Sequence, residues 1–510
     1  MKDKIEILKK RRVALSDSKR TESQHEKGRL TARERILMLV DKESFVELDP
    51  YVQLRSHNFN LQEKKTDGDG VVTGYGRVNG RKVAIYAQDA TAMGGSLGEM
   101  HAAKIAQVQD MAISCGCPII GIIDSGGARI QEGVNSLDGY AEVFNRNVRS
   151  SGVVPQIAVI VGPSAGGACY SPALMDFIFM VKDLSYMFIT GPQVIKLVTS
   201  EEIDFEGLGG AMVHNQKSGV AHFAMANEEG CFHFVKKLLR YLPSNNLEDP
   251  PRVPSEDPAD RLCDRILDLV PADSTKSYEM KDVIEEIVDR DSFFGLQKFY
   301  ARNVIIGLAR LDGFPVGIVA NQPKILAGCL DIDASDKIAR FVTFCDAFNI
   351  PVVNLVDVPG YLPGVNQEHQ GIIRHGAKIL YAYAASTIPK ISVVLRKSYG
   401  GAYIALSSKK MGYDQVIAWP TAELAVMGAE QAVDIVYGRE LSEKKSKRLR
   451  ARKIEEYREK FMNPYTAAQM GQVDMIIDPR ETRKTLISSL SFLRTKRVPK
   501  VSRKHGSMPV

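Results

Sequence analysis

The sequence predicts an α/β protein made of two tandem copies of one domain, related by internal duplication. Three observations lead to this prediction: a repeated segment, apolar strands that alternate with helices, and a glycine-rich turn in each half. Residues 77–129 and 310–362 align without a gap at a constant offset of 233, and 13 of the 53 pairs are identical. Unrelated segments of ordinary composition would share roughly 3–4 residues over this length. A chain of 510 residues also suits two domains better than a single core.

Each copy begins with a hairpin and continues as helices that alternate with buried strands. Gly80 and Gly313 mark the hairpin turns, and the identical triplets at 104–106 and 337–339 lie in the middle of a predicted helix. The apolar runs at 118–124 and 351–357 predict strands, and those at 157–162 and 391–397 are typical of strands covered on both faces. This alternation of strands and helices predicts α/β layers.

The segments outside the repeat define the ends and the boundary of the domains. Residues 1–40 predict two helices, with Thr31 as the N-cap of the second. The stretch 243–258 (PSNNLEDPPRVPSEDP) is dense in Pro, Asn and Asp, so we expect domains at 1–250 and 255–500. Residues 439–459 are highly charged and predict an exposed helix that the first copy lacks.

Composition and charge exclude several functional classes. The net charge of +6 is too small and too diffuse to indicate nucleic-acid binding. No run of 18 apolar residues occurs and the N-terminus is charged, so we expect neither a membrane span nor secretion. Seven cysteines without a C-x-x-C pair indicate reduced thiols, no zinc ribbon and a cytoplasmic location. The nine histidines form no metal-binding spacing, and we expect no metal.

The glycine-rich turns are the strongest candidates for chemistry. They read GPSAGGACYS at 162–171 and RKSYGGAYIAL at 396–406, and each follows a buried strand and opens a helix. Backbone N–H groups at a helix N-terminus favour negative charge, and two of them aimed at one oxygen form an oxyanion hole. A glycine pair can also simply allow close packing of helix and strand. The matched position of the two turns favours the functional interpretation.

Two other patterns are ambiguous. Residues 162–166 match G-x-S-x-G, the nucleophile elbow of serine hydrolases, but the duplicate at Ser398 breaks the pattern, which argues against a hydrolase. Asp124 and Asp357 end equivalent strands and are candidate acids, although such residues more often cap the next helix or bind loop amides. Gly126-Gly127 after Asp124 is a candidate phosphate cradle or acyl-site lining.

These segments together resemble a known family. The motifs GDGVVTGYG, DSGGARIQEGV, GPSAGGACYSPA, DIDASDKIARFV, GIIRHGAKILYAYA, YGGAYIAL and AWPTAELAVMG are similar to those of the carboxyltransferase (β) subunit of biotin-dependent acyl-CoA carboxylases. The resemblance is greatest to the propionyl-CoA carboxylase β and methylmalonyl-CoA decarboxylase α group, and it extends from about residue 20 to the C-terminal tail. It implies two crotonase-like (ClpP/crotonase) ββα-superhelix domains.

The resemblance also implies roles for individual residues. The N-terminal half would bind the acyl-CoA, and the C-terminal half would bind carboxybiotin. Gly166 and Gly167 match the amides that hold the thioester oxygen, and Gly401 and Ala402 match those that hold the ureido oxygen of biotin. At the position of Ile404, the resemblance to propionyl-specific members would imply Asp. The apolar residue found there is more similar to that of the transcarboxylase and decarboxylase members. The implied substrate-binding residues are Gly126, Gly127, Ala128, Ala165, Tyr170, Tyr403 and Ile404.

The reaction implied is carboxyl transfer between carboxybiotin and the α carbon of a short-chain acyl-CoA. The expected direction is propionyl-CoA to (S)-methylmalonyl-CoA, through an enolate held by two backbone oxyanion holes. No A-M-K-M biotinylation site or Walker-type ATP site occurs, so biotin would be carried on a separate protein. The expected partners are a biotin carboxyl carrier protein and a biotin carboxylase subunit, or the membrane subunits of a sodium-pumping methylmalonyl-CoA decarboxylase running the reverse transfer. The resemblance implies a homohexamer. A non-catalytic duplicated scaffold is the alternative from another class.

Overall fold

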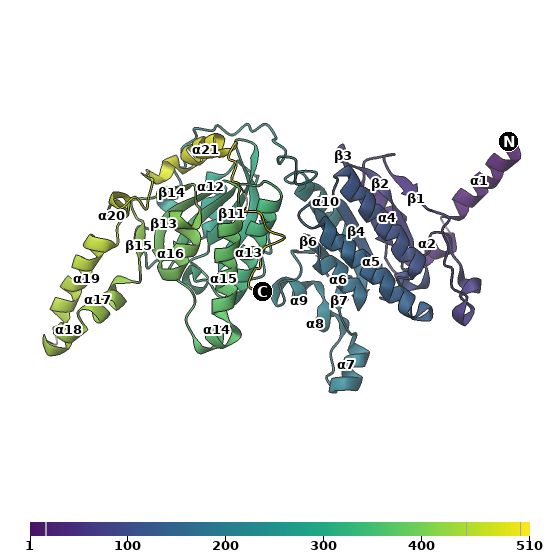
Figure 1. The fold of residues 1–510 in the computed structure, drawn as a ribbon, viewed down its shortest axis with the longest axis horizontal. Helices are drawn as coiled ribbons and strands as arrows, with labels where there is room; N and C mark the ends of the chain where they lie inside the picture. Colours follow the sequence, from purple (N-terminus) through teal and green to yellow (C-terminus); the bar gives the residue numbers. More distant parts are fainter. Residues whose placement is uncertain (16–17, 445, 500) are drawn as a thin grey trace. The chain divides into compact units, whose positions relative to one another are not determined.

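The computed structural model describes residues 1–15, 18–444, 446–499 and 501–510, and the chain divides into two compact units, Met1–Glu248 and Asp249–Val510 (Figure 1). The division falls inside the proline-rich segment 243–258. Each unit has its own sheet and its own hydrophobic core. The prediction of α/β layers is therefore confirmed for both halves.

The sheet of the N-terminal unit has the strand order β1-β2-β3-β4-β5-β6-β8, with β7 paired to the end of β5. The first three strands are antiparallel, and the remaining pairs are parallel. The strands are β1 (Val46–Leu48), β2 (Val71–Val78), β3 (Arg81–Gln88), β4 (Ile119–Ser125), β5 (Gln156–Ala165), β6 (Phe177–Val181), β7 (Tyr186–Phe188) and β8 (Phe223–Met225).

Helices cover both faces of this sheet. The core between the sheet and α4 and α5 contains Ile105, Val108 and Val143 (Figure 1). The helices α3 and α10 pack on each other, α3 also on β2 and β3, and α10 also on β5, β6 and β8. Thr31 caps α3 in a capping box with Glu34, as predicted. The helices are α1 (Lys2–Ala14), α2 (Ser18–His25), α3 (Ala32–Leu39), α4 (Glu99–Cys115), α5 (Val134–Ser150), α6 (Gly167–Ala173), α7 (Pro192–Thr199), α8 (Phe205–Gly209), α9 (Ala211–Gln216) and α10 (Glu228–Leu239).

The C-terminal unit repeats this architecture. Its strand order is β16-β14-β13-β12-β11-β10-β9, with β15 paired to the end of β13. The strands are β9 (Phe294–Leu296), β10 (Val304–Leu311), β11 (Phe314–Asn321), β12 (Val352–Val358), β13 (Lys390–Tyr399), β14 (Gln415–Ala418), β15 (Glu423–Ala425) and β16 (Met475–Ile476). The helices are α11 (Ile266–Leu269), α12 (Met280–Ile287), α13 (Ile332–Ala347), α14 (Val365–Gln370), α15 (Ile372–Ala385), α16 (Gly400–Ser407), α17 (Ala429–Val436), α18 (Gly438–Lys444), α19 (Lys447–Phe461), α20 (Pro464–Gln469) and α21 (Thr482–Leu493).

The charged segment predicted at 439–459 is helical, but it forms two helices, α18 and α19. They pack with α17, where Val433, Ile454 and Met462 belong to a small separate core. Among the described residues, no helix is long and apolar enough to cross a membrane.

The duplication extends further than the sequence repeat. The segment DKESFVEL at 41–48 matches DRDSFFGL at 289–296, and the helices that precede them, α3 and α12, have equal lengths. Asp41 and Asp289 accept hydrogen bonds from the N–H groups of both hairpin-turn residues in their own half. This outer part of the repeat has a different offset, 248, because the two halves have connecting loops of different length.

Candidate active site

The first glycine turn joins β5 to α6. Gly166 has φ 57°, a left-handed conformation that favours glycine, and its N–H donates to the Phe188 carbonyl at 3.0 Å. Gly167 and Ala168 then open α6, where backbone N–H groups lack an intrahelical acceptor. Within the described residues, no acceptor takes the N–H of Gly167 or Ala168. The turn therefore presents a pair of adjacent backbone donors.

An aromatic ring packs beneath this turn. A Cβ atom on Gly167 would lie 2.8 Å from the ring of Tyr140 in α5, so this position has no room for a side chain. Tyr140 is buried, and burial raises the pKa of its hydroxyl. Phe144 contacts Tyr140 at 5.6 Å between ring centroids and meets Tyr170 edge-on at 6.1 Å. Tyr170 is half exposed at the rim of the turn.

The loop after β4 supports the same turn. Gly127 has φ 101°, and a Cβ atom there would lie 2.9 Å from the carbonyl oxygen of Ala165 at the end of β5. The Gly126 N–H donates to the Gly94 carbonyl and the Gly127 N–H to Ser125 Oγ. Ala128 is half-buried and pairs with Leu97. The Gly126 and Gly127 amides thus have acceptors within the protein, and in this structure neither is presented to a phosphate.

The second glycine turn joins β13 to α16 and opens into a cavity. Gly400 has φ 58°, and Gly401 and Ala402 occupy the first turn of the helix. The ring of Tyr361 lies 3.3 Å from where a Gly401 Cβ atom would be. The cavity has a volume of about 570 Å³ and a largely apolar wall, and it is lined by Gly400, Gly401, Tyr403, Ile404, Leu424, Ala425, Val426, Tyr457, Phe461, Ala467, Met470 and Gln472.

The two turns are equivalent, but the expected donor pairs are not. Gly166 corresponds to Gly400 and Gly167 to Gly401, because both glycine pairs follow equivalent strands and have the same conformation. The expected pair Gly401–Ala402 thus corresponds to Gly167–Ala168, not to Gly166–Gly167. The Gly166 N–H is bonded to the Phe188 carbonyl, so the adjacent unbonded amides of the first turn, among the described residues, are those of Gly167 and Ala168.

Asp124 and Asp357 have a role that neither sequence hypothesis anticipated. Both are buried and both form ion pairs, Asp124 with Arg35 at 3.0 Å and Asp357 with Arg396 at 2.8 Å. Neither caps the following helix, although the Asp357 carboxylate does accept the Lys397 N–H. Burial raises the pKa of Asp124, and the neighbouring Arg35 opposes that shift. Their buried pairing with arginines is unsuited to catalytic acids.

The serine of the G-x-S-x-G pattern does not form a nucleophile. Ser164 is fully buried, and its hydroxyl donates to the Ala168 carbonyl at 2.9 Å. The equivalent Ser398 is also buried and exchanges a hydrogen bond with Ser407. No histidine in the described part of the chain bonds to either serine. The hydrolase interpretation is therefore excluded.

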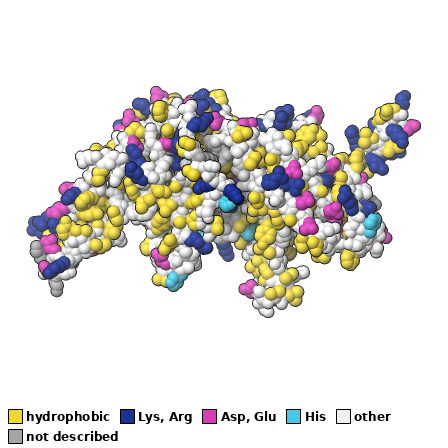
Figure 2. Space-filling model, in the orientation of Figure 1, with side chains coloured by type: hydrophobic (Ala, Val, Ile, Leu, Met, Phe, Trp, Pro, Cys, Tyr) yellow, Lys and Arg dark blue, Asp and Glu magenta, His cyan; other side chains and the backbone are white. Residues whose placement is uncertain are grey.

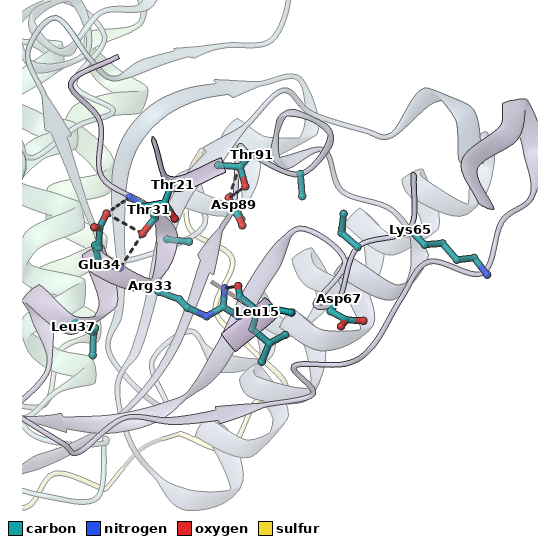
Figure 3. A pocket seen from close by; sticks show the side chains of 14 residues that line it. Leu15, Thr21, Thr31, Arg33, Glu34, Leu37, Lys65, Asp67, Asp89 and Thr91 are labelled. Carbon is teal, nitrogen blue, oxygen red and sulfur yellow. Dashed lines mark hydrogen bonds between the residues drawn. The ribbon is translucent and has the colours of Figure 1, made fainter. Parts of the chain in front are cut away.

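A second cavity, of about 400 Å³, lies in the N-terminal unit near the start of α3 (Figure 3). Its polar side chains are mostly bonded to each other or to the backbone: Thr31 to Glu34, Arg33 to the Leu15 carbonyl, and Thr91 to Asp89. No residue of either glycine turn lines this cavity. It carries no functional assignment.

Several residues of the site were missed by sequence reasoning. Tyr140 and Tyr361 lie far from the glycine pairs in the chain, and α19 and α20 bring Tyr457, Phe461 and Met470 to the second cavity. The sequence held one usable sign, at Arg396: the repeat has an arginine there, in an apolar strand, where the first copy has Gly162. Contacts between distant segments leave no pattern of spacing in a single sequence.

In the described part of the chain, no acceptor takes the N–H of Gly401 or Ala402 either. A duplicated α/β fold with adjacent unbonded N–H groups at the start of one helix in each half is suited to an enzyme that stabilises oxyanions with backbone donors. Comparison with known proteins identifies the family. The model of the carboxyl transferase domain matches residues 23–508.

Two relatives match the whole chain. The methylmalonyl-CoA decarboxylase subunit alpha of Veillonella parvula is 54% identical over 100% of this chain and 99% of that protein. The propionyl-CoA carboxylase carboxyltransferase subunit of Haloferax mediterranei is 54% identical over the full length of both. Among solved structures, transcarboxylase 12S, described as a hexamer with methylmalonyl-coenzyme A and methylmalonic acid bound, has a TM-score of 0.97 and 48% identity, covering 100% of this chain and 99% of that one.

The chain therefore belongs to the carboxyl transferase family, and it is a biotin-dependent acyl-CoA carboxyltransferase. The near-complete structural match also confirms the prediction of two crotonase-like domains.

Proposed function

We propose that this chain is the carboxyltransferase subunit that moves a carboxyl group between biotin on a separate carrier protein and the α carbon of propionyl-CoA, giving (S)-methylmalonyl-CoA. The N-terminal unit binds the acyl-CoA, and the C-terminal unit binds the biotin ring. The observation that supports this most is the pair of unbonded N–H groups in each half, Gly167–Ala168 and Gly401–Ala402. One pair serves the thioester oxygen and the other the ureido oxygen.

The residues of the second turn suit the biotin ring. Gly401 is exposed, so its N–H is accessible to a carbonyl-type oxygen, and the apolar cavity beside it is large enough for a bicyclic ring. When bound, carboxylated biotin supplies the carboxyl group and a ring nitrogen that can take up a proton. The chain then contributes orientation and fixed N–H dipoles, which stabilise charge as it develops on the two oxygens.

Ile404 bears on the second candidate function. This residue is 48% exposed in the wall of the second cavity, and an apolar side chain at this position resembles the transcarboxylase and decarboxylase members of the family. The Veillonella relative, named as a decarboxylase subunit, supports a second candidate function: the same chemistry in reverse, in a sodium-pumping methylmalonyl-CoA decarboxylase. The partners would then be membrane subunits in place of a biotin carboxylase.

We further propose a cytoplasmic homohexamer that works with a biotin carboxyl carrier protein and a biotin carboxylase subunit. Support for an assembly comes from α7, whose side chains are all at least partly exposed. Figure 2 shows hydrophobic side chains gathered there, and Val194, Leu197 and Val198 are 47%, 84% and 78% exposed. Apolar surfaces of this kind are usually covered by another protein chain.

Replacing Gly401 tests the proposed function directly. Gly401→Pro removes one N–H donor, whereas Gly401→Ala adds a Cβ atom and keeps the donor. The expected result is a kcat about 10²–10³-fold lower for Gly401→Pro, because an oxyanion donor acts on charge that develops in the transition state. The measurement is carboxyl transfer from methylmalonyl-CoA to free biotin by the full chain, with malonyl-CoA as the competing acyl donor.

The alanine variant is the matched control, since its Cβ atom meets only the Tyr361 ring at 3.3 Å. It should keep most of the wild-type kcat. Equal kcat values for the proline and alanine variants would show that the Gly401 N–H does not contribute to catalysis. A wild-type enzyme that binds no acyl-CoA would support the scaffold alternative.

A further inference from the structure

The strand that leads into each glycine turn carries a bulge, and a buried aspartate lies opposite it. In the N-terminal unit, Ile123 pairs with Ile160 and Ser125 with Ser164, so β5 has two extra residues opposite Asp124. In the C-terminal unit, Val356 pairs with Val394 and Val358 with Ser398, so β13 has the same excess opposite Asp357. A bulge bends its strand and changes the direction of the chain beyond it, and here the glycine turn begins within a few residues of the bulge.

Each aspartate bonds to the bulge through an arginine. Arg35 Nη1 pairs with Asp124, and its Nη2 donates to the Val161 carbonyl inside the first bulge at 3.2 Å. Arg396 lies within the second bulge, and its Nε donates to Asp357 at 2.8 Å. The Lys397 N–H, also in that bulge, donates to the same carboxylate. The equivalent residue in the first half is Pro163, which has no N–H.

The arginine that binds the aspartate comes from a different element in each half. At the equivalent position in the other half, a smaller or apolar residue replaces it. Arg35 on α3 corresponds to Val283 on α12, and Arg396 on β13 corresponds to Gly162 on β5. A Cβ atom on Gly162 would lie 2.0 Å from Asp124 Oδ1, so the carboxylate fills the space that a side chain would need. The aspartate–arginine contact at the bulge is thus kept in both halves by different residues.

We infer that Asp124–Arg35 and Asp357–Arg396 are positioning pairs that hold the two bulges and thereby aim the N–H donors of the two glycine turns. This inference rests on the proposed role of those turns in carboxyl transfer. Neither pair touches the reacting groups, because all four side chains are at most 2% exposed. A pair that served stability alone would have no reason to recur at the bulge after its arginine had moved to another element.

The C-terminal unit offers a matched control for testing the inference. Arg396 is buried and binds one carboxylate and the carbonyls of Pro271, Asp273 and Lys276. Arg483 is also buried and binds the Asp289 carboxylate at 2.7 Å, the Asp257 carboxylate at 3.7 Å, and the carbonyls of Pro258, Ile287 and Asp257. Within the described residues, none of the hydrogen-bond or ion-pair partners of Arg483 belongs to the second turn or lines its cavity.

The test compares Arg396→Lys with Arg483→Lys in the full chain. Lysine cannot reproduce the guanidinium fork, so both variants should have a lower Tm. Only Arg396→Lys should lower kcat for transfer from methylmalonyl-CoA to free biotin, by about 10-fold or more, with KM for the acyl-CoA within about twofold of wild type. A second readout, independent of activity, is amide hydrogen exchange, which should accelerate in the segment 396–407 only in Arg396→Lys.

Asp357→Asn, which keeps the size of the side chain, should reproduce both effects. Unchanged kcat and unchanged exchange at 396–407 in Arg396→Lys, or equal losses in Arg483→Lys, would overturn the inference. If Arg396→Lys and Asp357→Asn were both recovered only unfolded, the pair would be a folding element and the positioning role would be withdrawn. Failure of the proposed function is a separate outcome, because the wild-type enzyme would then transfer no carboxyl group.

Discussion

Lys104 and Lys337 occupy the same place in the two copies, and each binds the backbone of the loop that precedes its hairpin. Lys104 Nζ donates to the carbonyls of Gly68 and Val71. Lys337 Nζ donates to four carbonyls, with the shortest distance, 2.7 Å, to Tyr300 and Val304. Burial lowers the pKa of Lys104 to about 8 and that of Lys337 to about 7. The identity of these lysines in the repeat therefore reflects a structural role in the loops.

The lowered pKa of Lys337 predicts a dependence of stability on pH. Its folded pKa of about 7 lies below the unfolded value of about 10.4, so the unfolded state binds more protons between these limits. The stabilising contribution is present above the unfolded pKa and is lost as the pH falls through about 7. Between these two pKa values, the free energy of unfolding should therefore rise by up to about 1.4 kcal/mol per pH unit from this group.

Denaturant unfolding at pH 7.5, 8.5 and 9.5 would measure this slope. Lys337→Met should reduce it, while the same change at the exposed Lys298 should leave it as in the wild type. An identical slope in Lys337→Met would contradict the assignment of the shift to this residue.

At the scale of elements, the two hairpin turns have the same backbone conformation but different neighbouring atoms. Asn79-Gly80 and Asp312-Gly313 all have positive φ, between 51° and 78°, as two-residue hairpin turns of type I′ require. A Cβ atom on Gly80 would meet nothing within 4 Å, whereas one on Gly313 would lie 1.9 Å from the carbonyl oxygen of Val253. The sequence predicted both turns, but only the fold shows that the second is covered by another segment.

This difference predicts unequal costs for the same substitution. Gly80→Ala should destabilise its unit by about 1 kcal/mol, the strain of a left-handed alanine. Gly313→Ala should cost about 1–3 kcal/mol more, because a backbone carbonyl must also move. Urea unfolding of the two variants would measure the difference between their free energies of unfolding. Equal decreases in stability would show that the contact with Val253 relaxes without cost.

The helices α7 and α17 are a second pair of equivalent elements with different surroundings. Both start one residue after a glycine, Gly191 and Gly428. In the C-terminal unit α18 and α19 pack with α17, and Ala429 and Val433 are buried there. In the N-terminal unit no residue of α7 is buried. The charged insertion at 439–459, predicted as exposed, thus has a covering role on one side.

At the scale of the whole molecule, the exposed apolar surface of α7 and the hexameric assembly named for the transcarboxylase relative lead to one prediction. Light scattering of the purified chain should give the mass of six copies, and the value should not change on dilution through the micromolar range. A monomer at these concentrations would contradict the proposed homohexamer and leave the apolar face of α7 unexplained.

Local and repetitive features were determined by the sequence itself. The repeat at offset 233, the alternation of apolar strands with helices, the Thr31 cap and the glycine turns depend on residues close together in the chain, and all of them occur in the structure. Apolar periodicity and turn chemistry act over a few residues, so they leave a pattern that can be recognised in a single sequence.

Only the tertiary structure decided which amides remain free and what holds them. The bond from the Gly166 N–H to Phe188 moves the first donor pair to Gly167 and Ala168. The partner of Asp124 lies 89 residues away, and that of Asp357 lies 39 residues away on another strand. Such contacts depend on how β-strands and helices meet in space, and different residues can satisfy the same contact. The glycine turns were therefore visible in the sequence, but the choice of free amides within them and the framework around them were not.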